Sequence, residues 1–219
     1  GGITVGTGLI RSGELKDIIA ERIKYGNAVT EFQQKYKSLP GDMLDAYDYW
    51  GTDCGTNTTD LNTGCNGNGD GSVVESANGE SLKMWEHLGL SGIIKQNFSG
   101  SGTALNGTTP ALSTANIMKS NYPKTFWSVS SVASNAAVTG AKLYLHFGAV
   151  SGNSSIVEVI PSLSRGEAQT IDLKVDDGAA NTGTVAGDTT GTCSDSGTDY
   201  YPMVANGESY KGDCILHFV

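Results

Sequence analysis

The residues best suited to chemistry in this 219-residue chain are side-chain oxygens in a glycine-rich loop. Asn66, Asn68 and Asp70 alternate with glycine in the run Cys65-Asn-Gly-Asn-Gly-Asp-Gly71, so an oxygen recurs at every second position. This spacing is typical of the first half of a calcium loop of the D-x-[DN]-x-[DN]-G type. The loop is therefore a candidate calcium site.

The second half of such a calcium loop does not follow in the sequence. The twelfth position is Ala77, where a bidentate Glu is required for most of the affinity. Glu75 or Glu80 could replace that ligand only if the backbone takes a different path. The missing carboxylate favours the alternative, a turn that uses Asn and Gly for left-handed conformations.

The sequence predicts no enzyme. The three histidines lie far apart and form no H-E-x-x-H motif, so a zinc site is not expected, and each is predicted to be a surface or half-buried side chain: His87, His146 and His217. Neither a G-x-S-x-G elbow nor a phosphate-binding G-x-x-x-x-G-K-[ST] loop occurs. The net charge of −9 also argues against a nucleic-acid-binding surface, which would be basic.

The four cysteines fall into two local pairs. Four cysteines allow three connectivities, and pairing Cys54 with Cys65 and Cys193 with Cys214 closes the shortest loops. Each such bridge would contribute roughly 3 kcal/mol by restricting the unfolded chain. Disulfides indicate an oxidising compartment, which means the periplasm or the outside of the cell.

These loops need a scaffold, and its main element is a predicted helix from Leu9 to Leu39. Apolar residues recur at alternating steps of three and four and place one stripe on one face: Leu15, Ile18, Tyr25, Val29, Phe32 and Tyr36. Ile19 and Ile23 are expected to widen the stripe, and Glu21 is expected on a polar face. Pro40-Gly41 is expected to end the helix.

The ten residues before this helix, Gly1 to Ile10, carry no charged side chain. They are compatible with the end of an apolar segment that continues upstream, or with a flexible glycine-rich start. Ten residues are too few to cross a bilayer, which needs about 20. The two interpretations differ only in what precedes Gly1.

The rest of the chain predicts short helices followed by strands. A second helix is expected over Glu75–Leu90, with Asn78 as its N-cap and Gly89 just past its end, and a third opens with a Ser164-x-x-Glu167 capping box. The segment 141–150 alternates as expected for a half-buried strand, with Leu143, Leu145 and Phe147 on one face and Lys142, Tyr144 and His146 on the other. Two closing strands are expected over 182–186 and 214–219. The predicted fold class is α+β, with the long helix (1–39) packed on the antiparallel sheet of a head (40–219) as a single domain.

In this order the elements resemble the type IV pilin-like proteins, which include pilins, minor pilins and type II secretion pseudopilins. Four features carry the resemblance over most of the chain, residues 99–160 excepted: the apolar start running into a helix that ends Tyr36-x-x-Leu39-Pro40-Gly41-Asp42; the loop 65–71 followed by Glu75 and Trp85-x-His87-Leu88-x-Leu90-x-Gly92; the segment Glu167-Ala168-x-x-Ile171-Asp172-x-Lys174-x-Asp176-Asp177-Gly178, followed by Gly183; and a cysteine pair whose last member precedes the final strand.

The resemblance implies a structural subunit that assembles with homologous subunits into a pilus (fimbrium) or a secretion pseudopilus. It implies an upstream helix, beginning at a methylated Phe, that anchors the subunit in the inner membrane before assembly. The implied location is the bacterial cell surface or the periplasm, and the Cys193–Cys214 segment would match the disulfide-bounded loop that pilins expose. The chain lacks the family's first residues, so their roles cannot be assigned to it.

Some pseudopilins bind calcium in a loop of the C-terminal sheet, and the resemblance implies a second candidate site here. Asp172, Asp176 and Asp177 are the nearest group of oxygens. Carboxylates at the end of a helix oppose its dipole, which adds to the case for a cation, and a helix end with a plain Asp-Gly turn is the alternative. No cofactor is required for the filament function. The alternative function is a secreted calcium-dependent module that binds surfaces or glycans.

Overall fold

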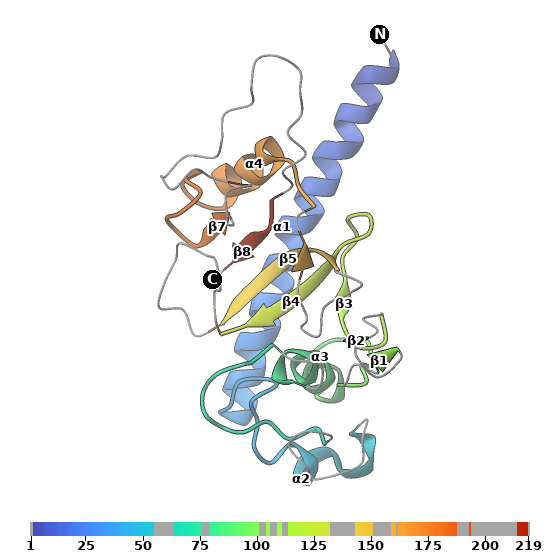
Figure 1. The fold of residues 1–219 in the computed structure, drawn as a ribbon, viewed down its shortest axis with the longest axis vertical. Helices are drawn as coiled ribbons and strands as arrows, with labels where there is room; N and C mark the ends of the chain where they lie inside the picture. Colours follow the sequence, from blue (N-terminus) through green and yellow to red (C-terminus); the bar gives the residue numbers. More distant parts are fainter. Residues whose placement is uncertain are drawn as a thin grey trace.

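In the computed structural model, the described residues are 2–54, 64–75, 79–100, 104–105, 109–110, 114–131, 143–150, 159–160, 162–187, 193 and 214–218. Within them, one long helix runs behind an antiparallel sheet along the long axis of the molecule (Figure 1). The fold class is therefore α+β, as the sequence predicts.

The long helix, α1, is continuous from Gly2 to Tyr36. The apolar stripe predicted for it is buried except for Tyr36, which is half-buried. Lys37 takes a left-handed conformation (φ +59°) and ends the helix three residues earlier than predicted, before Pro40 can act. In Figure 1 the N-terminal part of α1 extends beyond the sheet and α4.

Two expectations about α1 are wrong. Ile23 does not widen the buried stripe, because 49% of its surface is exposed. Glu21 does not lie on a polar face; it is buried, and its carboxylate accepts hydrogen bonds from Ser120 Oγ (2.6 Å), Asn121 N (2.7 Å) and Trp127 Nε1 (2.7 Å). Polar partners supplied by distant segments make this burial tolerable.

The main sheet has the strand order β3-β4-β5-β8-β7, and every pairing is antiparallel. A sixth strand, β6, pairs with the end of β5, and β1 and β2 form a separate hairpin. The bounds are β1 Ala104–Leu105, β2 Thr109–Pro110, β3 Met118–Lys119, β4 Phe126–Ser130, β5 Tyr144–Val150, β6 Val159–Ile160, β7 Val185–Gly187 and β8 Leu216–Phe218.

One face of the sheet packs on α1 through aromatic side chains. Trp127 of β4 lies 5.7 Å from the Tyr25 ring and 5.1 Å from Phe147, and Phe218 of β8 joins the same group. Tyr25 also meets Trp85 edge-on at 5.3 Å. Helix, sheet and Trp85 therefore share one hydrophobic core.

The other face of β5 was expected to be half-exposed, and that is wrong. Tyr144 and His146 are buried together with His217, which lies directly opposite His146 in the register of β5 and β8. His146 Nε2 is 2.8 Å from Ser130 Oγ, and its Nδ1 is 2.5 Å from His217 Nδ1. Ser130, His146 and His217 hydrogen-bond one another across strands, which the alternation along a single strand cannot reveal. His87 is buried as well, so no histidine is a surface residue.

Three short elements follow α1: α2 (Ala46–Trp50), the 3₁₀ turn η1 (Gly51–Asp53) and α3 (Glu80–Leu90). α3 begins five residues later than predicted, with Gly79 at its N-cap, and the expected cap Asn78 lies outside the described residues. Gly89 stays inside the helix, and Gly92 takes the left-handed conformation (φ +73°) after its end. Trp50 packs back on α1, 6.3 Å from Phe32.

The last helix, α4 (Arg165–Val175), confirms the predicted capping box. The Ser164 and Glu167 side chains each bond the other's backbone N–H. Both predicted disulfides, Cys54–Cys65 and Cys193–Cys214, are also present. A search of the described residues finds no helix long and apolar enough to span a membrane.

Candidate functional site

Three carboxylates meet where the chain leaves α1. Asp42 follows the end of α1, Asp70 lies in the glycine-rich loop and Glu80 begins α3. One oxygen of each lies within 4.8 Å of the others, and we call this group the first carboxylate cluster. Asp42 and Glu80 are only 3% and 6% exposed, whereas Asp70 faces solvent.

The glycine-rich loop forms the cluster by lying across the segment that follows α1. Gly67 N donates to Met43 O at 2.7 Å, and Gly69 N donates to Asp42 O at 3.0 Å. A Cβ atom at Gly67 would overlap the Asp42 backbone, so only glycine allows this approach. The alternation of glycine with polar residues thus lets the loop lie directly on the chain beneath it.

Backbone N–H groups hold the two buried carboxylates in place. Asp42 accepts from Asp70 N (3.0 Å) and Gly71 N (2.8 Å). Glu80 accepts from Asn68 N (2.9 Å) and from the N–H of Val74 (3.2 Å). These four donors orient both carboxylates toward each other and toward Asp70.

The electrostatics of the first cluster favour a bound cation or proton. Burial raises the pKa of both Asp42 and Glu80 above the ordinary carboxyl value, and the neighbouring carboxylates raise it further. Their backbone hydrogen bonds act in the opposite direction without cancelling the shift. An all-oxygen site with this charge suits a hard divalent cation such as Ca²⁺.

The other two loop residues considered as calcium ligands lie differently. Asn66 turns its Oδ1 atom toward α2, where it accepts from Tyr47 N at 2.7 Å. Asn68 stays beside the cluster, and its Nδ2 atom donates to Asp70 Oδ2 at 3.0 Å. Asp70 is the loop residue whose carboxylate meets Asp42 and Glu80, and Asn68 Oδ1 accepts from Asp70 N at 2.9 Å.

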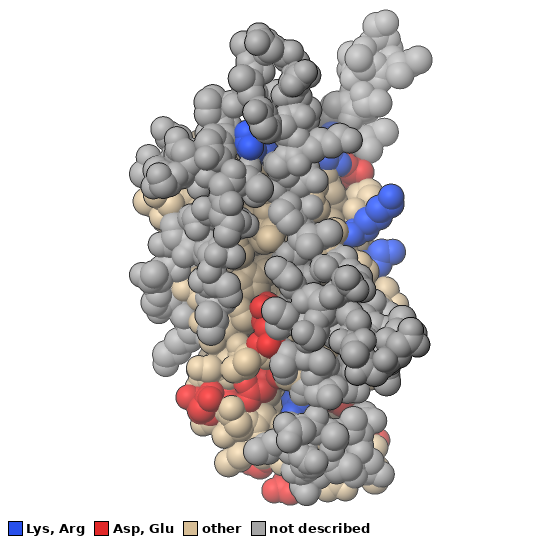
Figure 2. All heavy atoms as spheres, viewed as in Figure 1, with Lys and Arg blue, Asp and Glu red and all other residues tan. Residues whose placement is uncertain are grey.

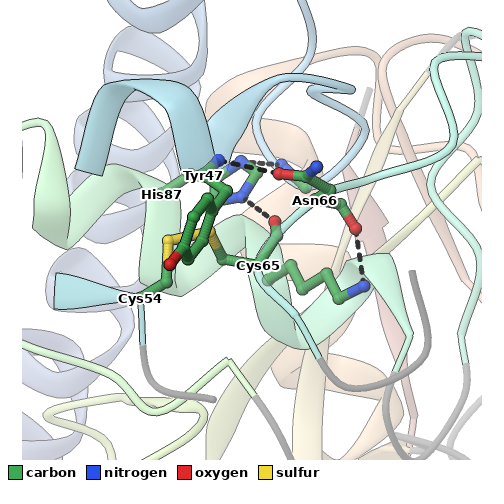
Figure 3. Close-up of a disulfide and its surroundings, with 7 residues drawn as sticks. Tyr47, Cys54, Cys65, Asn66 and His87 are labelled. Carbon is green, nitrogen blue, oxygen red and sulfur yellow. Dashed lines mark hydrogen bonds between the residues drawn. A yellow bond between two sulfur atoms is a disulfide. The ribbon is translucent and has the colours of Figure 1, made fainter. Parts of the chain in front are cut away.

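The Cys54–Cys65 disulfide and His87 of α3 connect the segments that carry the first cluster, and we call them its base; Figure 3 shows the disulfide beside His87. His87 of α3 accepts from Gly41 N (2.9 Å) at Nδ1, and its Nε2 atom is 2.7 Å from Cys65 O. The donor at Gly41 leaves Nε2 as the protonated nitrogen, so neutral His87 links α3 to both segments. Burial lowers the pKa of His87 to about 4.

The second carboxylate cluster is Asp172, Asp176 and Asp177, and the structure brings all three predicted residues within 4.8 Å. Asp172 is buried near the end of α4, whereas the other two are exposed in the turn that leads to β7. Asp172 Oδ1 accepts from Gly178 N at 3.1 Å, and Asp176 accepts from Thr184 N.

The exposed part of the second cluster is largely satisfied by its own turn. Asp177 accepts from Ala179 N (2.9 Å) and from the Thr182 hydroxyl (2.6 Å). The Thr182 hydrogen bond, together with that of Ala179, lowers the pKa of Asp177. Gly183 (φ +76°) is required here, because a Cβ atom would overlap the Asp176 carboxylate.

A different set of polar contacts fixes α1 to the head. Arg11 forms an ion pair with Glu167 of α4 and lies 4.6 Å over the Tyr122 ring. Burial by itself would raise the pKa of Glu167, but the hydrogen bonds from Arg11 and Ser164 lower it overall. Arg11 and buried Glu21 therefore fix the orientation of α1 at two positions along the helix.

Sequence reasoning did not identify Asp42 or Glu21 as site residues. Asp42 lies in a Pro-Gly-Asp turn whose partner loop is 28 residues away. Glu21 occupies a helix position, and the residues that bind it are about 100 residues away in sequence. The only signal for Glu80 was its place near the end of the incomplete calcium loop.

Compared with models of known protein families, with curated proteins and with solved structures, the chain matches none of them.

Proposed function

We propose that this protein is a structural subunit of a pilin-like filament, with α1 as the assembly element and the head as the exposed part. The observation that carries the proposal is the geometry of α1. The helix is 35 residues long, its C-terminal part is locked into the head, and its N-terminal part extends beyond the sheet (Figure 1).

The contacts of α1 with the head support a role in transmitting force along a filament. A helix that transmits force to a head must not rotate or slide against it. Arg11 and Glu21 prevent both motions, because each is bound by segments more than 90 residues away in sequence. The two disulfides, which indicate an oxidising compartment, are compatible with a filament outside the cytoplasm.

Expression of the complete gene in a bacterial host tests this function. We expect filaments by electron microscopy, and an upstream segment containing an apolar stretch of about 20 residues. Ile23→Asp, on the outward face of α1, should reduce filament number at least tenfold. Leu173→Asp, at a similarly exposed apolar residue of α4, is the matched control and should leave assembly intact. Wild-type cells without filaments, or an upstream segment without an apolar stretch, would contradict the proposal.

A calcium-dependent module that binds surfaces or glycans is the second candidate, and the first carboxylate cluster favours it. Two buried carboxylates with raised pKa values beside Asp70 form the stronger of the two oxygen clusters. Binding of Ca²⁺ alone fits either function, since a filament subunit could use the ion for stability. Retention on immobilised glycans with Ca²⁺ and elution by a chelator would support the module over the filament.

A further inference from the structure

Nearly all of the net charge of the chain lies in one segment. Between Ser38 and Leu82 there are eight Asp and Glu residues and no Lys or Arg. The rest of the chain is close to neutral, with 15 acidic and 14 basic residues. A net charge of −9 is therefore not spread over the molecule.

The described residues of this segment lie at the end of the molecule that holds α2 and the start of α3 (Figure 1). Four carboxylates are exposed there, and we call them the acidic pole: Asp45, Asp48, Asp53 and Asp70. Two large apolar side chains are exposed among them, Leu44 (59%) and Tyr49 (57%). A groove of about 690 Å³, lined by Leu44, Asp45 and Tyr36 among others, opens in the same region.

Lys35 and Lys37 are exposed at the end of α1 beside the acidic pole, and Lys37 lines the same groove. Four further exposed lysines lie at a different level of the molecule. Lys119 and Lys124 flank the β3–β4 turn, which holds Glu21 of α1 through Ser120 and Asn121. Lys16 and Lys24 are exposed on α1 within about one turn of Glu21. We call these four lysines the basic face; Asp17 is the exposed acidic residue among them. Figure 2 shows basic side chains mainly toward the upper end and acidic ones toward the lower end.

The two surfaces are too far apart to neutralise each other within one molecule. Sixteen helical residues separate Glu21 from Lys37, which corresponds to about 24 Å along α1. We infer that the acidic pole of one copy docks on the basic face of a second copy. The contact is heterologous, so a pair of copies leaves one acidic pole and one basic face free, and the association can extend. This inference rests on the proposed filament function and names a contact between the heads of neighbouring subunits.

A second copy fits these surfaces better than a small cation or a purely basic ligand does. Protein interfaces combine an apolar centre with a charged rim. The acidic pole has Leu44 and Tyr49 as such a centre. Neither a small cation nor a polyamine would use the apolar side chains.

The test is self-association of the purified chain, measured by sedimentation velocity at low and at high ionic strength. Variant A carries Asp45→Lys and Asp48→Lys, and variant B carries Lys119→Glu and Lys124→Glu. We expect wild type to form oligomers that grow with concentration and dissociate in 0.5 M salt, as screening requires. Each variant alone should stay monomeric, because its two surfaces then carry charge of the same sign. In an equimolar mixture, the acidic pole of B meets the basic face of A as in the wild type, and the reversed pole of A meets the reversed face of B, so oligomers should form.

The two variants control for net charge, because A makes the protein less acidic and B makes it more acidic. If general repulsion governed association, A would associate more than wild type, and that result would overturn the inference. Monomeric wild type at low salt, or oligomers unchanged by salt, would overturn it too. Filaments formed in cells by variant A alone or by variant B alone would also overturn it while leaving the filament function intact. Absence of filaments with the wild-type protein would contradict the filament function.

Discussion

Each of the two carboxylate clusters contains three acidic side chains, yet their surroundings differ. In the first cluster, Asp42 and Glu80 are buried, and their donors come from a loop that is separate in sequence from Asp42. In the second cluster, Asp176 and Asp177 are exposed, and the donors come from the turn in which they lie. Burial raises the pKa of carboxyl groups in the first, and hydrogen bonding lowers the pKa of Asp177 in the second.

The two clusters contain the same number of carboxylates but differ in burial and in the direction of their pKa shifts, so the number of carboxylates does not decide where a cation binds. A cation gains most where like charges are held together in a partly dehydrated place, because it removes their mutual repulsion. We therefore expect the first cluster to respond to Ca²⁺ and the second to act mainly as a structured turn. The sequence favoured the second cluster, through the family resemblance, so this ranking can be tested directly.

The largest expected effect comes from removing the base of the first cluster. Replacing Cys54 and Cys65 by Ser should lower the free energy of unfolding by about 3 kcal/mol, since the bridge closes a short loop. It should also weaken any Ca²⁺ response, because the loop that carries Asp70 begins at Cys65. Urea unfolding with and without Ca²⁺ measures both. An undiminished Ca²⁺ response would show that the disulfide does not support the cluster.

The next effect is loss of a buried acceptor. Asp42→Ala should lower the free energy of unfolding by about 1 to 3 kcal/mol, because the N–H groups of Asp70 and Gly71 lose their partner. Asp177→Ala is the matched control in the other cluster and should change the melting temperature little, since its side chain is exposed. Equal losses in the two variants would remove the distinction between the clusters.

The features that the sequence predicted are those formed by residues close to one another in the chain. The capping box of α4, the buried stripe of α1 and the second cluster all involve residues within a few positions of one another. The first cluster was predicted through Asp70, with Glu80 only as a possible replacement ligand and Asp42 not at all, because the three residues meet by tertiary folding of three segments. No local pattern encodes that meeting.

The buried polar groups were missed for the same reason. His146 appears on the polar side of an alternating strand, and its partners Ser130 and His217 belong to other strands. Glu21 appears on the polar side of a helix and is buried by the β3–β4 turn. Alternation and helical period report the chemistry of a side chain, but not the donors and acceptors that other segments bring to it.

The stabilisation that Ca²⁺ gives through the first cluster should be smaller than the losses caused by the disulfide and Asp42 substitutions. At pH 7, Ca²⁺ at ten times its Kd should stabilise the protein by about 1.4 kcal/mol if it binds only the folded state. Glu80→Gln should abolish the rise in melting temperature, whereas Asp177→Asn should retain it. The rise should shrink near pH 4.5, because protons then compete for Asp42 and Glu80, whose pKa values are raised. A rise lost in Asp177→Asn but kept in Glu80→Gln would reverse our ranking.

Without calcium, the pH dependence of the melting temperature of Glu80→Gln tests whether the pKa of Glu80 is raised. The folded-state pKa of Glu80 is raised, so Glu80 costs stability as the pH rises from its ordinary value through the folded one. The melting temperature of the variant, relative to wild type, should therefore increase between about pH 4 and pH 7. Buried His87, with its pKa near 4, destabilises both proteins as the pH falls below about 6.5, so it cancels in the difference. A flat difference would mean that Glu80 ionises normally.

Asp177→Asn should give the smallest effect and one of opposite sign. The folded-state pKa of Asp177 is lowered by the Thr182 hydroxyl, so its contribution is present above the ordinary carboxyl pKa of about 3.9 and is lost as the pH falls below that value. The variant should melt slightly below wild type at pH 7, and the gap should close toward pH 2.5. Thr182→Val, which removes the same hydrogen bond but keeps the carboxylate, should reproduce the gap at pH 7. If Asp177→Asn instead melted above wild type at neutral pH, repulsion within the second cluster would outweigh its hydrogen bonds, and that cluster would become the better candidate for a cation.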